Sequence, residues 1–425
     1  MVAASSLDRG GNVKTGHVIV IGAGMVGLST AWHLQEDGVR VTVVDKTGVA
    51  GGSSWGNAGW LAPALTLPLP DPAILATGMK ETLKPSSPVY VPFTANPRLI
   101  KFLVDFTRHC TPGKWRQAMA VYNEVNKLGL QAFDELAAGG VAELTKSADP
   151  FLAAFASDAD RETLVTEFRH VAEAGGETDF DLLTGEEIHH IEPALGEGVT
   201  SGILLRGQRF INPGRFVRSL ADSVRERGGE IREGATVVDI RDRGVTGVDV
   251  HTSQEILHAD AVVIATGTWL GRLARAFGVK TIVQAGRGYS FTVQPEHMPT
   301  SPVYFPSQRV ACTPLGDGFR VAGMMEFRRP GDPLDERRVK AIIDAAKPML
   351  TGIDWEARTD EWVGSRPCTA DGLPIIGATK SSRVFVSGGH GMWGIVLGPL
   401  SGRMLAQQIT RGEVHPVMKN FNPLR

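Results

Sequence analysis

The sequence predicts an α/β protein with a parallel sheet, and three segments support this fold class. Residues 17–45 contain a buried strand, a glycine turn, an apolar-faced helix and a second strand, which make a complete βαβ unit. Residues 215–240 hold an amphipathic helix and then another strand. Residues 261–267 (AVVIATG) are a further buried strand ending in a glycine turn. Because strands that alternate with helices pair in parallel, all these strands are expected in one sheet.

Length and charge bound the class of protein. A chain of 425 residues suggests two domains, or one domain with a large insertion. The formal net charge of −2 gives no reason to expect nucleic acid or an anionic membrane surface as partner. A small molecule is therefore the expected partner.

The cysteines and the N-terminus indicate the compartment. Cys110, Cys312 and Cys368 are far apart and share no metal-ligand spacing, so we expect neither a metal site nor disulfides, and a reducing compartment. Residues 1–16 are polar, which favours a loose tail over a secretory signal. No run approaches the roughly 18 apolar residues of a membrane helix. We expect a cytoplasmic protein, with peripheral contact at the inner face of the membrane left open.

The first βαβ unit carries a dinucleotide-binding pattern. Gly22 permits the tight turn, Gly24 lets the backbone approach a pyrophosphate, and Gly27 lets helix and strand pack closely. Asp45 ends the second strand, where a carboxylate can accept hydrogen bonds from a ribose diol. Glycines at a strand–helix turn can also serve packing alone. The order of strand, helix and acid favours an adenine dinucleotide, without choosing between FAD and NAD.

The loop that follows favours FAD. Residues 48–63 (GVAGGSSWGNAGWLAP) are rich in glycine and serine, where a simple NAD domain would continue into its next helix. In flavoproteins of the glutathione-reductase type, such a loop runs along the pyrophosphate towards the flavin. The alternative, a flexible surface loop, fits poorly with the apolar residues 58–63.

Taken together, the motifs resemble the D-amino-acid oxidase superfamily of FAD enzymes, and within it the D-amino-acid dehydrogenase branch. The resemblance covers nearly the whole chain and follows the family's order. The segments that carry it are residues 17–45, 53–63 (SSWGNAGWLAP), 184–195 (TGEEIHHIEPAL), 207–240, 261–270, 286–293 (GRGYSFTV), 362–377 (WVGSRPCTADGLPIIG) and 387–409.

The resemblance implies a glutathione-reductase-type, Rossmann-like FAD-binding domain and an α+β substrate domain built from two insertions. Residues 14–60, 196–270 and 356–425 are expected in the FAD-binding domain. Residues 61–195 and 271–355 are expected in the substrate domain.

The resemblance also implies non-covalent FAD and the residues that hold it. Cys368 invites a covalent link, but its spacing does not match the family's tether, and a buried, inert cysteine is expected instead. Val238 is expected to meet the adenine edge through its backbone, although a plain buried strand would have the same letters. The expected cofactor-binding residues are Gly22, Gly24, Met25, Val26, Gly27, Asp45, Lys46, Gly52, Ser53, Ser54, Asn57, Ala58, Gly59, Val238, Thr266, Gly267, Gly389, Gly391, Met392 and Gly394.

The expected reaction moves a hydride from the substrate Cα to flavin N5, so the protein has to bind and orient the substrate. By resemblance, Arg366 of the G-x-R-P motif binds the substrate carboxylate; the alternative is a structural ion pair with an acid such as Asp371. Tyr304 and Tyr289 could add a hydroxyl to the carboxylate. Both lie in apolar strand patterns, so a core role remains open for each.

Three more positions complete the expected active site. The family's last helix, here residues 394–409, points its N-terminus at the flavin O2/N1 edge, and His390 just before it either supports the ring or moves protons. Trp60 and Met392-Trp393 stand where relatives have glutamine and smaller residues. This bulk predicts a pocket reshaped for an apolar or cyclic substrate.

We therefore expect an FAD-dependent dehydrogenase or oxidase that converts an amino acid, D-configured by family analogy, to an imino acid that hydrolyses to the 2-oxo acid. The electron acceptor is a quinone, an electron-transfer protein or O2. The alternatives are a sarcosine-, glycine- or proline-type amine oxidase, and the FAD subunit of a heteromeric opine or hydroxyproline dehydrogenase. A binding protein with an inactive site is the third hypothesis.

Overall fold

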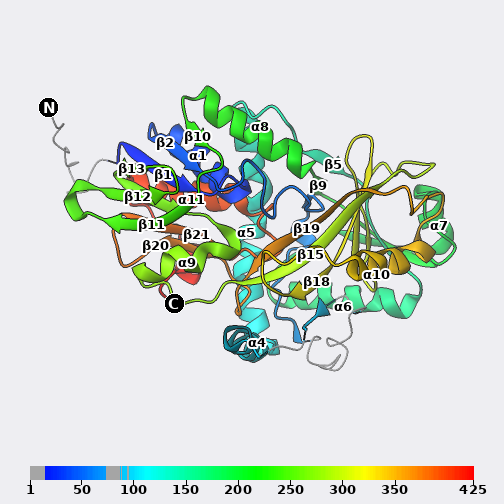
Figure 1. The fold of residues 1–425 in the computed structure, drawn as a ribbon. Helices are drawn as coiled ribbons and strands as arrows, with labels where there is room; N and C mark the ends of the chain where they lie inside the picture. The colour runs from blue at the N-terminus through cyan, green and yellow to red at the C-terminus, as the bar shows by residue number, and fades with distance from the viewer. Residues whose placement is uncertain (1–14, 73–86, 88, 93–94) are drawn as a thin grey trace.

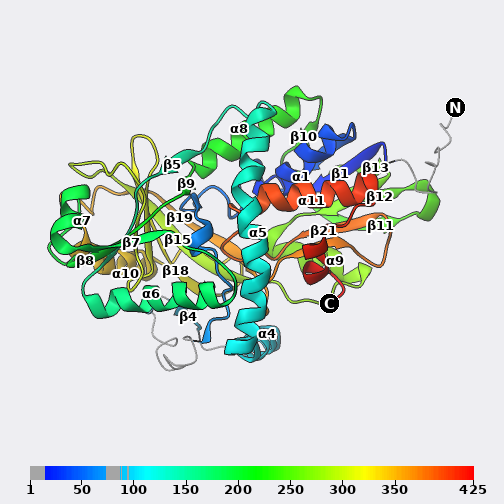
Figure 2. The ribbon, with the colours of Figure 1, turned by 180° about the vertical axis from the view of Figure 1, so that it is seen from behind.

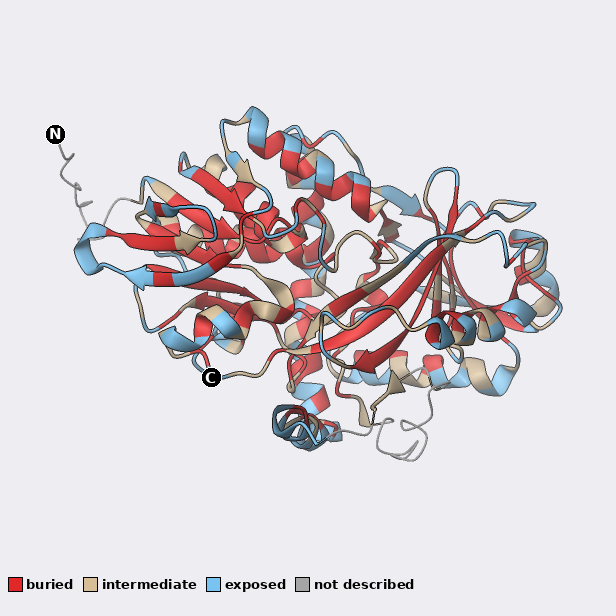
Figure 3. Ribbon diagram, in the orientation of Figure 1, coloured by how far each residue is buried: buried red, intermediate tan, exposed pale blue. Residues whose placement is uncertain are grey.

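The structure is a computed structural model that describes residues 15–72, 87, 89–92 and 95–425. The expected N-terminal tail lies almost wholly outside these residues. Figure 1 shows two lobes, each built around its own sheet, and Figure 2 shows α5 (Pro112–Ala138) crossing the back of the molecule beside α11 (Gly398–Arg411). Both sheets consist mainly of buried residues (Figure 3).

The first lobe contains the predicted parallel sheet. Its order is β10-β2-β1-β14-β21-β20, and only β20 runs antiparallel to its neighbour. The strands are β1 (His17–Ile21), β2 (Arg40–Val44), β10 (Glu230–Arg232), β14 (Ala261–Ile264), β20 (Ile375–Ala378) and β21 (Val384–Gly388).

The two faces of this sheet have different covers. Alternate residues of β1 point to opposite faces. Val18 and Val20 join a core with α1, α5, α8 and α11, whereas Ile19 and Ile21 join a core with a three-stranded sheet and α9. These elements are α1 (Met25–Glu36), α8 (Pro213–Glu226), α9 (Leu270–Ala274), β11 (Val237–Asp242), β12 (Val248–Thr252) and β13 (Ile256–Ala259). Glycines let α11 pack closely on α1, since a Cβ at Gly402 would lie 2.6 Å from the Ser29 backbone carbon.

The second lobe is built on a larger mixed sheet of order β19-β15-β18-β17-β16-β6-β8-β7, with β4 paired to β18. One face packs on α10 (Glu336–Ala346) and the other packs partly on α6 (Asp158–Glu173). The strands are β4 (Val89–Tyr90), β6 (Phe151–Phe155), β7 (Phe180–Thr184), β8 (Ser201–Leu205), β15 (Gln284–Val293), β16 (Val303–Phe305), β17 (Val310–Pro314), β18 (Phe319–Phe327) and β19 (Thr359–Cys368).

Smaller elements join the lobes. A three-stranded sheet of order β3-β9-β5 carries the end of the glycine-rich loop, and α4 precedes α5. The bounds are β3 (Trp60–Leu61), β5 (Lys146–Ala148), β9 (Gln208–Phe210), α4 (Pro97–His109) and α7 (Gly185–Ile191). The 3-10 turns are η1 (Pro63–Leu65), η2 (Gly244–Thr246), η3 (Gly267–Trp269), η4 (Arg275–Phe277), η5 (Lys347–Met349) and η6 (Pro416–Phe421).

The structure confirms the α/β class and places several segments differently from the expected domain division. Strand β8 belongs to the second sheet and β9 to the small sheet β3-β9-β5, although their residues were expected in the FAD-binding domain. Strand β19 also belongs to the second sheet, which moves the last crossing from 356 to about 368. Conversely, α5 lies within the expected insertion but packs into the first core. Strand pairing and helix packing set these limits, and motif order does not reveal them.

No helix among the described residues is long and apolar enough to cross a membrane. The same residues contain no group of three histidines, cysteines or acids that could hold a metal ion.

Candidate active site

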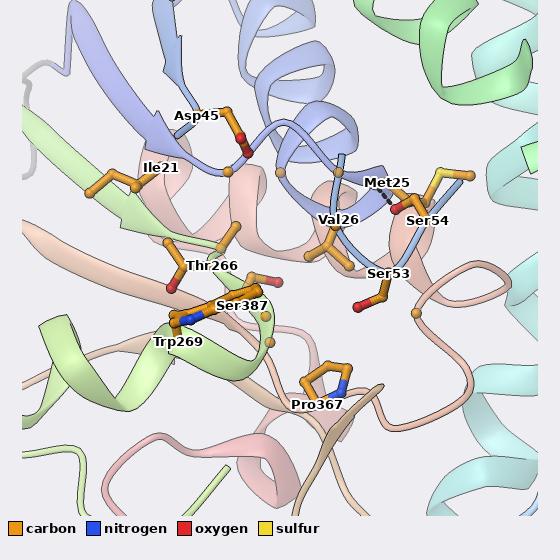
Figure 4. A pocket seen from close by; sticks show the side chains of 18 of the residues that line it. Ile21, Met25, Val26, Asp45, Ser53, Ser54, Thr266, Trp269, Pro367 and Ser387 are labelled. Atoms are coloured by element: carbon orange, nitrogen blue, oxygen red, sulfur yellow. Dashed lines mark hydrogen bonds between the residues drawn. The ribbon is translucent and has the colours of Figure 1, made fainter. Parts of the chain in front are cut away.

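A cavity lies at the carboxyl ends of β1, β2, β14 and β21, where ligands bind in open α/β sheets. It has a volume of about 240 Å³. Figure 4 shows Asp45 at the top of the cavity, Thr266 and Trp269 on the left, Ser53 and Ser54 on the right, and Pro367 at the bottom.

The glycine turn of the first βαβ unit forms one wall. Gly22 has φ +119°, and a Cβ there would lie 2.4 Å from the Ala265 carbonyl oxygen. A Cβ at Gly27 would lie 1.9 Å from the Gly22 carbonyl oxygen. A Cβ at Gly24 would lie 3.2 Å from the Ser54 hydroxyl. The first two glycines are required by strand–helix packing, and the third keeps backbone open to the cavity beside the N-terminus of α1, where a pyrophosphate fits.

Asp45 joins two loops and faces the cavity. Its Oδ1 accepts hydrogen bonds from the backbone of Thr47 (2.8 Å) and Gly48 (3.0 Å), and its Oδ2 accepts one from Ala23 N (2.9 Å). Each carboxylate oxygen has two lone pairs, so Oδ2 keeps capacity for one more donor. The expected ribose contact is compatible with this geometry.

The wall next to Asp45 contains Lys46, which was expected to bind the cofactor, and Trp269 and Arg272, which were not. Lys46 places its ammonium 3.3 Å from the centre of the Trp269 ring, and burial lowers the pKa of this lysine. The sequence did carry a signal for Trp269, because this residue follows by two positions the turn at Thr266 and Gly267, both expected to bind the cofactor.

The glycine-rich loop forms the opposite end. Ser54 Oγ accepts a hydrogen bond from Met25 N (3.2 Å), and Ser53 Oγ donates one to the Ser365 carbonyl (2.5 Å). The loop is also held from the second lobe: buried Arg320 donates to the Trp55 carbonyl (2.7 Å), and its guanidinium stacks 4.8 Å from the Trp55 ring centre. The loop therefore connects the two sheets.

Most of the expected cofactor residues line this cavity, and four do not. Val238 is 49% exposed, and Val237 lines the cavity in its place, because β11 has an irregularity between Val237 and Asp239. Gly59 has φ +83° and packs against the Ile211 carbonyl. Ala58 and Gly389 also lie outside the lining. The residues that line it as expected are Gly22, Gly24, Met25, Val26, Gly27, Asp45, Lys46, Gly52, Ser53, Ser54, Asn57, Thr266, Gly267, Gly391, Met392 and Gly394.

Three polar atoms on the cavity wall are buried without a hydrogen-bond partner. They are Thr266 Oγ1, Ser387 Oγ and His390 Nδ1. Leaving a buried polar group unsatisfied costs about 1–3 kcal/mol, so such groups indicate that a polar ligand belongs here. FAD, with phosphates, hydroxyls and a hydrogen-bonding ring system, fits a cavity with this lining.

Arg366 lines the cavity beside Pro367, at the end away from Asp45. Its Nη1 donates to the Met324 carbonyl (2.7 Å), and the guanidinium lies over Gly288, where a Cβ would come within 2.3 Å of Cζ. Burial lowers the pKa of Arg366. The alternative partner Asp371 instead pairs with Arg425 (2.8 Å), and no acid in the described part of the chain lies within ion-pair distance of Arg366.

His390 is buried against the last helix. Its Nε2 shares a 2.9 Å hydrogen bond with Ser401 Oγ on α11, and burial lowers its pKa to about 4. The imidazole is therefore neutral near pH 7, which favours a supporting role over proton transfer. Helix α11 begins at Gly398 and not at Gly394, so turns at residues 391–396 separate its N-terminus from the cavity.

Trp60 and Tyr304 form an aromatic wall of the second lobe outside the cavity lining. Their ring centres lie 5.2 Å apart, and Trp60 Nε1 donates to Thr313 Oγ1 (2.9 Å). Burial raises the pKa of Tyr304. Met392 does line the cavity, whereas Trp393 donates to the Leu67 carbonyl (2.7 Å). Of the bulky residues expected in the cavity, Met392 is thus present there, and Trp60 and Trp393 are not.

Tyr289 does not line the cavity. It belongs to the core under α10, and its hydroxyl donates to Glu326 Oε1 (2.5 Å). Burial raises the pKa of this hydroxyl. This placement corrects the expected carboxylate contact and supports the core interpretation, since neighbouring strand residues alternate between faces and apolar spacing alone does not say which face meets the cofactor.

The fold and this site together define a flavin-dependent oxidoreductase of the Rossmann-like type. The chain belongs to the DAO family of FAD-dependent oxidoreductases, whose family model matches residues 17–408, and FAD is its cofactor.

Individual relatives agree with this assignment. The chain is 28% identical over 399 residues to a D-amino acid dehydrogenase of Cereibacter sphaeroides, covering 92% of this chain and 91% of the relative. Its fold is similar to glycine oxidase from Geobacillus kaustophilus (TM-score 0.71, 20% identity, covering 97% of this chain and 99% of that one). It is also similar to iminodiacetate oxidase from Chelativorans (TM-score 0.70, 19% identity, covering 96% and 98%).

Proposed function

We propose that the protein oxidises the Cα–N bond of an amino acid, D-configured in the preferred substrate, to an imino acid that water hydrolyses to the 2-oxo acid. The similarity to a D-amino acid dehydrogenase along 92% of the chain supports the substrate class. The observation that carries the proposal is Arg366, a cation on the cavity wall with no acid among the described residues to neutralise it.

The surroundings of Arg366 suit a carboxylate. One N–H group is held by the Met324 carbonyl, which fixes the plane of the guanidinium and leaves the other groups for a ligand. Gly288 gives this plane the room it needs, because any side chain there would collide with it. A planar fork of this kind binds a carboxylate through two parallel hydrogen bonds.

Among the residues that the structure describes, none near this end of the cavity can act as a general base. The titratable residues of the lining are Asp45, Lys46, Arg272, Arg366 and His390. Asp45 lies at the far end, and His390 has a pKa of about 4 with Nε2 engaged by Ser401. FAD, when bound, supplies the two-electron acceptor. The substrate amine therefore arrives neutral from solvent, and kcat/KM should rise with pH towards the pKa of the substrate ammonium group.

The electron acceptor and the location belong to the same proposal. The name of the relative supports a dehydrogenase that passes electrons to a quinone or an electron-transfer protein, and not to O2. A cytoplasmic protein in peripheral contact with the membrane fits a quinone acceptor. Comparing peroxide formation with reduction of a quinone analogue in one preparation separates the two outcomes.

Anaerobic reduction of the bound flavin tests the substrate class. A panel of D- and L-amino acids, glycine and N-alkyl amino acids should show bleaching, fastest with D-amino acids. Preference for glycine or an N-alkyl amino acid would replace this proposal with an amine oxidase, and no bleaching by any member would refute it.

Two substitutions test the role of Arg366. Arg366→Ala should lower kcat/KM by about a hundredfold or more while FAD stays bound. The reason is that the variant loses two charge-assisted hydrogen bonds to the substrate carboxylate, which together are worth several kcal/mol. Arg366→Lys should recover part of this loss. Arg241→Ala, on the exposed strand β11, is the control. Unchanged kinetics in Arg366→Ala would show that the arginine is structural.

A further inference from the structure

A second pocket of about 480 Å³ adjoins the cofactor cavity. It lies between the start of α4, the turn before α9, the start of β15 and the turn after β18. Trp269 and Arg272 line both spaces, so their side chains stand between the pocket and the cofactor site. Nothing in the proposed reaction uses this pocket.

The lining of the second pocket is strongly basic. It contains four arginines, Arg98, Arg272, Arg328 and Arg329, and one acid, Asp332. Arg328 is partly neutralised by Glu326 (3.4 Å) and Asp335 (3.7 Å).

The other three arginines have no acid within ion-pair distance in the described part of the chain. Arg98 has only a long contact from Nη2 to the Val283 carbonyl (3.4 Å), and the side chains of Arg272 and Arg329 have neither a hydrogen bond nor an ion pair there. Many exposed arginines in the described part of the chain pair with neighbouring acids, as Arg206 does with Asp179. This pocket instead has three exposed arginines without a counter-charge in one lining.

We propose that this pocket binds a small dianion, a phosphate or a dicarboxylate. Three uncompensated guanidinium groups and one carboxylate leave two positive charges, which a dianion neutralises. Arginine forks bind both phosphate and carboxylate oxygens through paired hydrogen bonds. A recessed site with several donors discriminates such a ligand from chloride or acetate, which fill only part of the donor set.

Arg272 can contact both this ligand and the cofactor. Its side chain lines both spaces, and Lys46 lies over the other member of the shared wall, Trp269. A dianion in the second pocket would draw Arg272 away from the cofactor side. The ligand therefore has a route to change flavin affinity without entering the active site.

Titration of the FAD-loaded enzyme by calorimetry tests the site. Sodium phosphate and sodium succinate are the probes, with total ionic strength kept constant by sodium chloride, and acetate is the monoanion control. We expect saturable binding of one dianion per chain and none of acetate. The probe with the higher affinity shows whether the site prefers a phosphate or a dicarboxylate.

Variants assign the binding to this pocket. Arg329→Gln and Arg98→Gln should each weaken the dianion about tenfold or more, as expected for loss of one charge-assisted contact. Arg275→Gln, in the neighbouring turn η4 and outside the pocket, should bind as the wild type does. Flavin content measured on each variant shows that it is folded.

Two results would overturn the proposal: no saturable binding of either dianion, or equal affinity for the dianion in Arg329→Gln and Arg275→Gln. The proposed oxidation is unaffected by any of these outcomes, because its test uses Arg366 and the amino-acid panel.

Discussion

The two sides of the active-site cavity are built in different ways. The cofactor side consists mainly of backbone and glycines from residues 22–54, joined by the ends of neighbouring parallel strands. The substrate side depends on side chains from different strands of the second sheet: Arg366 lines the cavity, and Arg320 holds the glycine-rich loop beside it. One side is thus built mainly from backbone and the other depends on individual side chains.

This difference determines how each side of the cavity is held in place. Close backbone packing fixes the cofactor side, so that a single methyl group can disrupt it. The glycine-rich loop is held from the second lobe by several separate contacts, which come from Arg320, the Ser365 carbonyl and the Trp362 ring beside Gly56, so the loss of one contact should weaken binding without abolishing it. Substitutions on the two sides should therefore differ in both kind and size of effect.

The largest effect is expected on the cofactor side, at Gly27. In Gly27→Ala the new Cβ would lie 1.9 Å from the Gly22 carbonyl oxygen, which is backbone and cannot rotate away. We expect the variant to lose FAD completely or to be insoluble, as judged by the flavin absorbance of the purified protein. Gly113→Ala has no atom within 4 Å of its Cβ and should keep its flavin. A yellow Gly27→Ala protein would show that the turn is adaptable.

The second effect concerns His390, which lies between the two sides. Burial lowers its pKa from 6.5 to about 4, so the unfolded chain binds a proton between these values that the folded chain does not. Its contribution to stability is therefore present above pH 6.5 and lost as the pH falls towards 4, by about 3 kcal/mol at most.

Thermal unfolding of the holoenzyme between pH 4.5 and 7 measures this effect. The rise of melting temperature with pH should be smaller in His390→Gln than in the wild type, whereas buried His33, whose pKa is also about 4, keeps part of the rise in both proteins. His190→Gln, at an exposed position, is the matched control. Parallel curves for wild type and His390→Gln would mean that His390 titrates normally.

Arg320 tests the connection between the two sides. Arg320→Ala removes the contacts to the Trp55 and Asn57 carbonyls and the stacking on Trp55, leaving a gap at a position that is 6% exposed. Loss of a charged hydrogen bond of about 1.5–3 kcal/mol should weaken FAD binding roughly tenfold to a hundredfold. Flavin titration of the apoprotein measures it, and Arg320→Lys should recover part of the affinity. FAD binding equal to wild type would show that the loop does not need the second lobe.

The difference between the two sides also explains which features could be predicted from the sequence. The parallel sheet and the glycine turn could be predicted from residues 17–45, 215–240 and 261–267, because strands that alternate with helices pair in parallel. Most of the cavity lining could be predicted as well, because it follows the ends of these strands. Tyr289 could not be placed, since the choice of sheet face depends on the packing of α10. The exposure of the Val238 side chain could not be predicted either, since the irregularity in β11 has no marker in the sequence. The basic second pocket escaped notice because its arginines come from four separate segments.

The smallest effect is expected at Trp60, on the substrate side. Trp60→Phe keeps an aromatic ring against Phe151 and Tyr304 but removes the donor to Thr313 Oγ1, a hydroxyl on a fully buried residue. The free energy of unfolding should fall by about 1 kcal/mol, with FAD retained. Thr313→Val in the Trp60→Phe background should restore part of the loss, because replacing both partners by apolar groups removes the unsatisfied atom. Urea unfolding of the four proteins forms a double-mutant cycle, and strict additivity would show that the hydrogen bond contributes nothing.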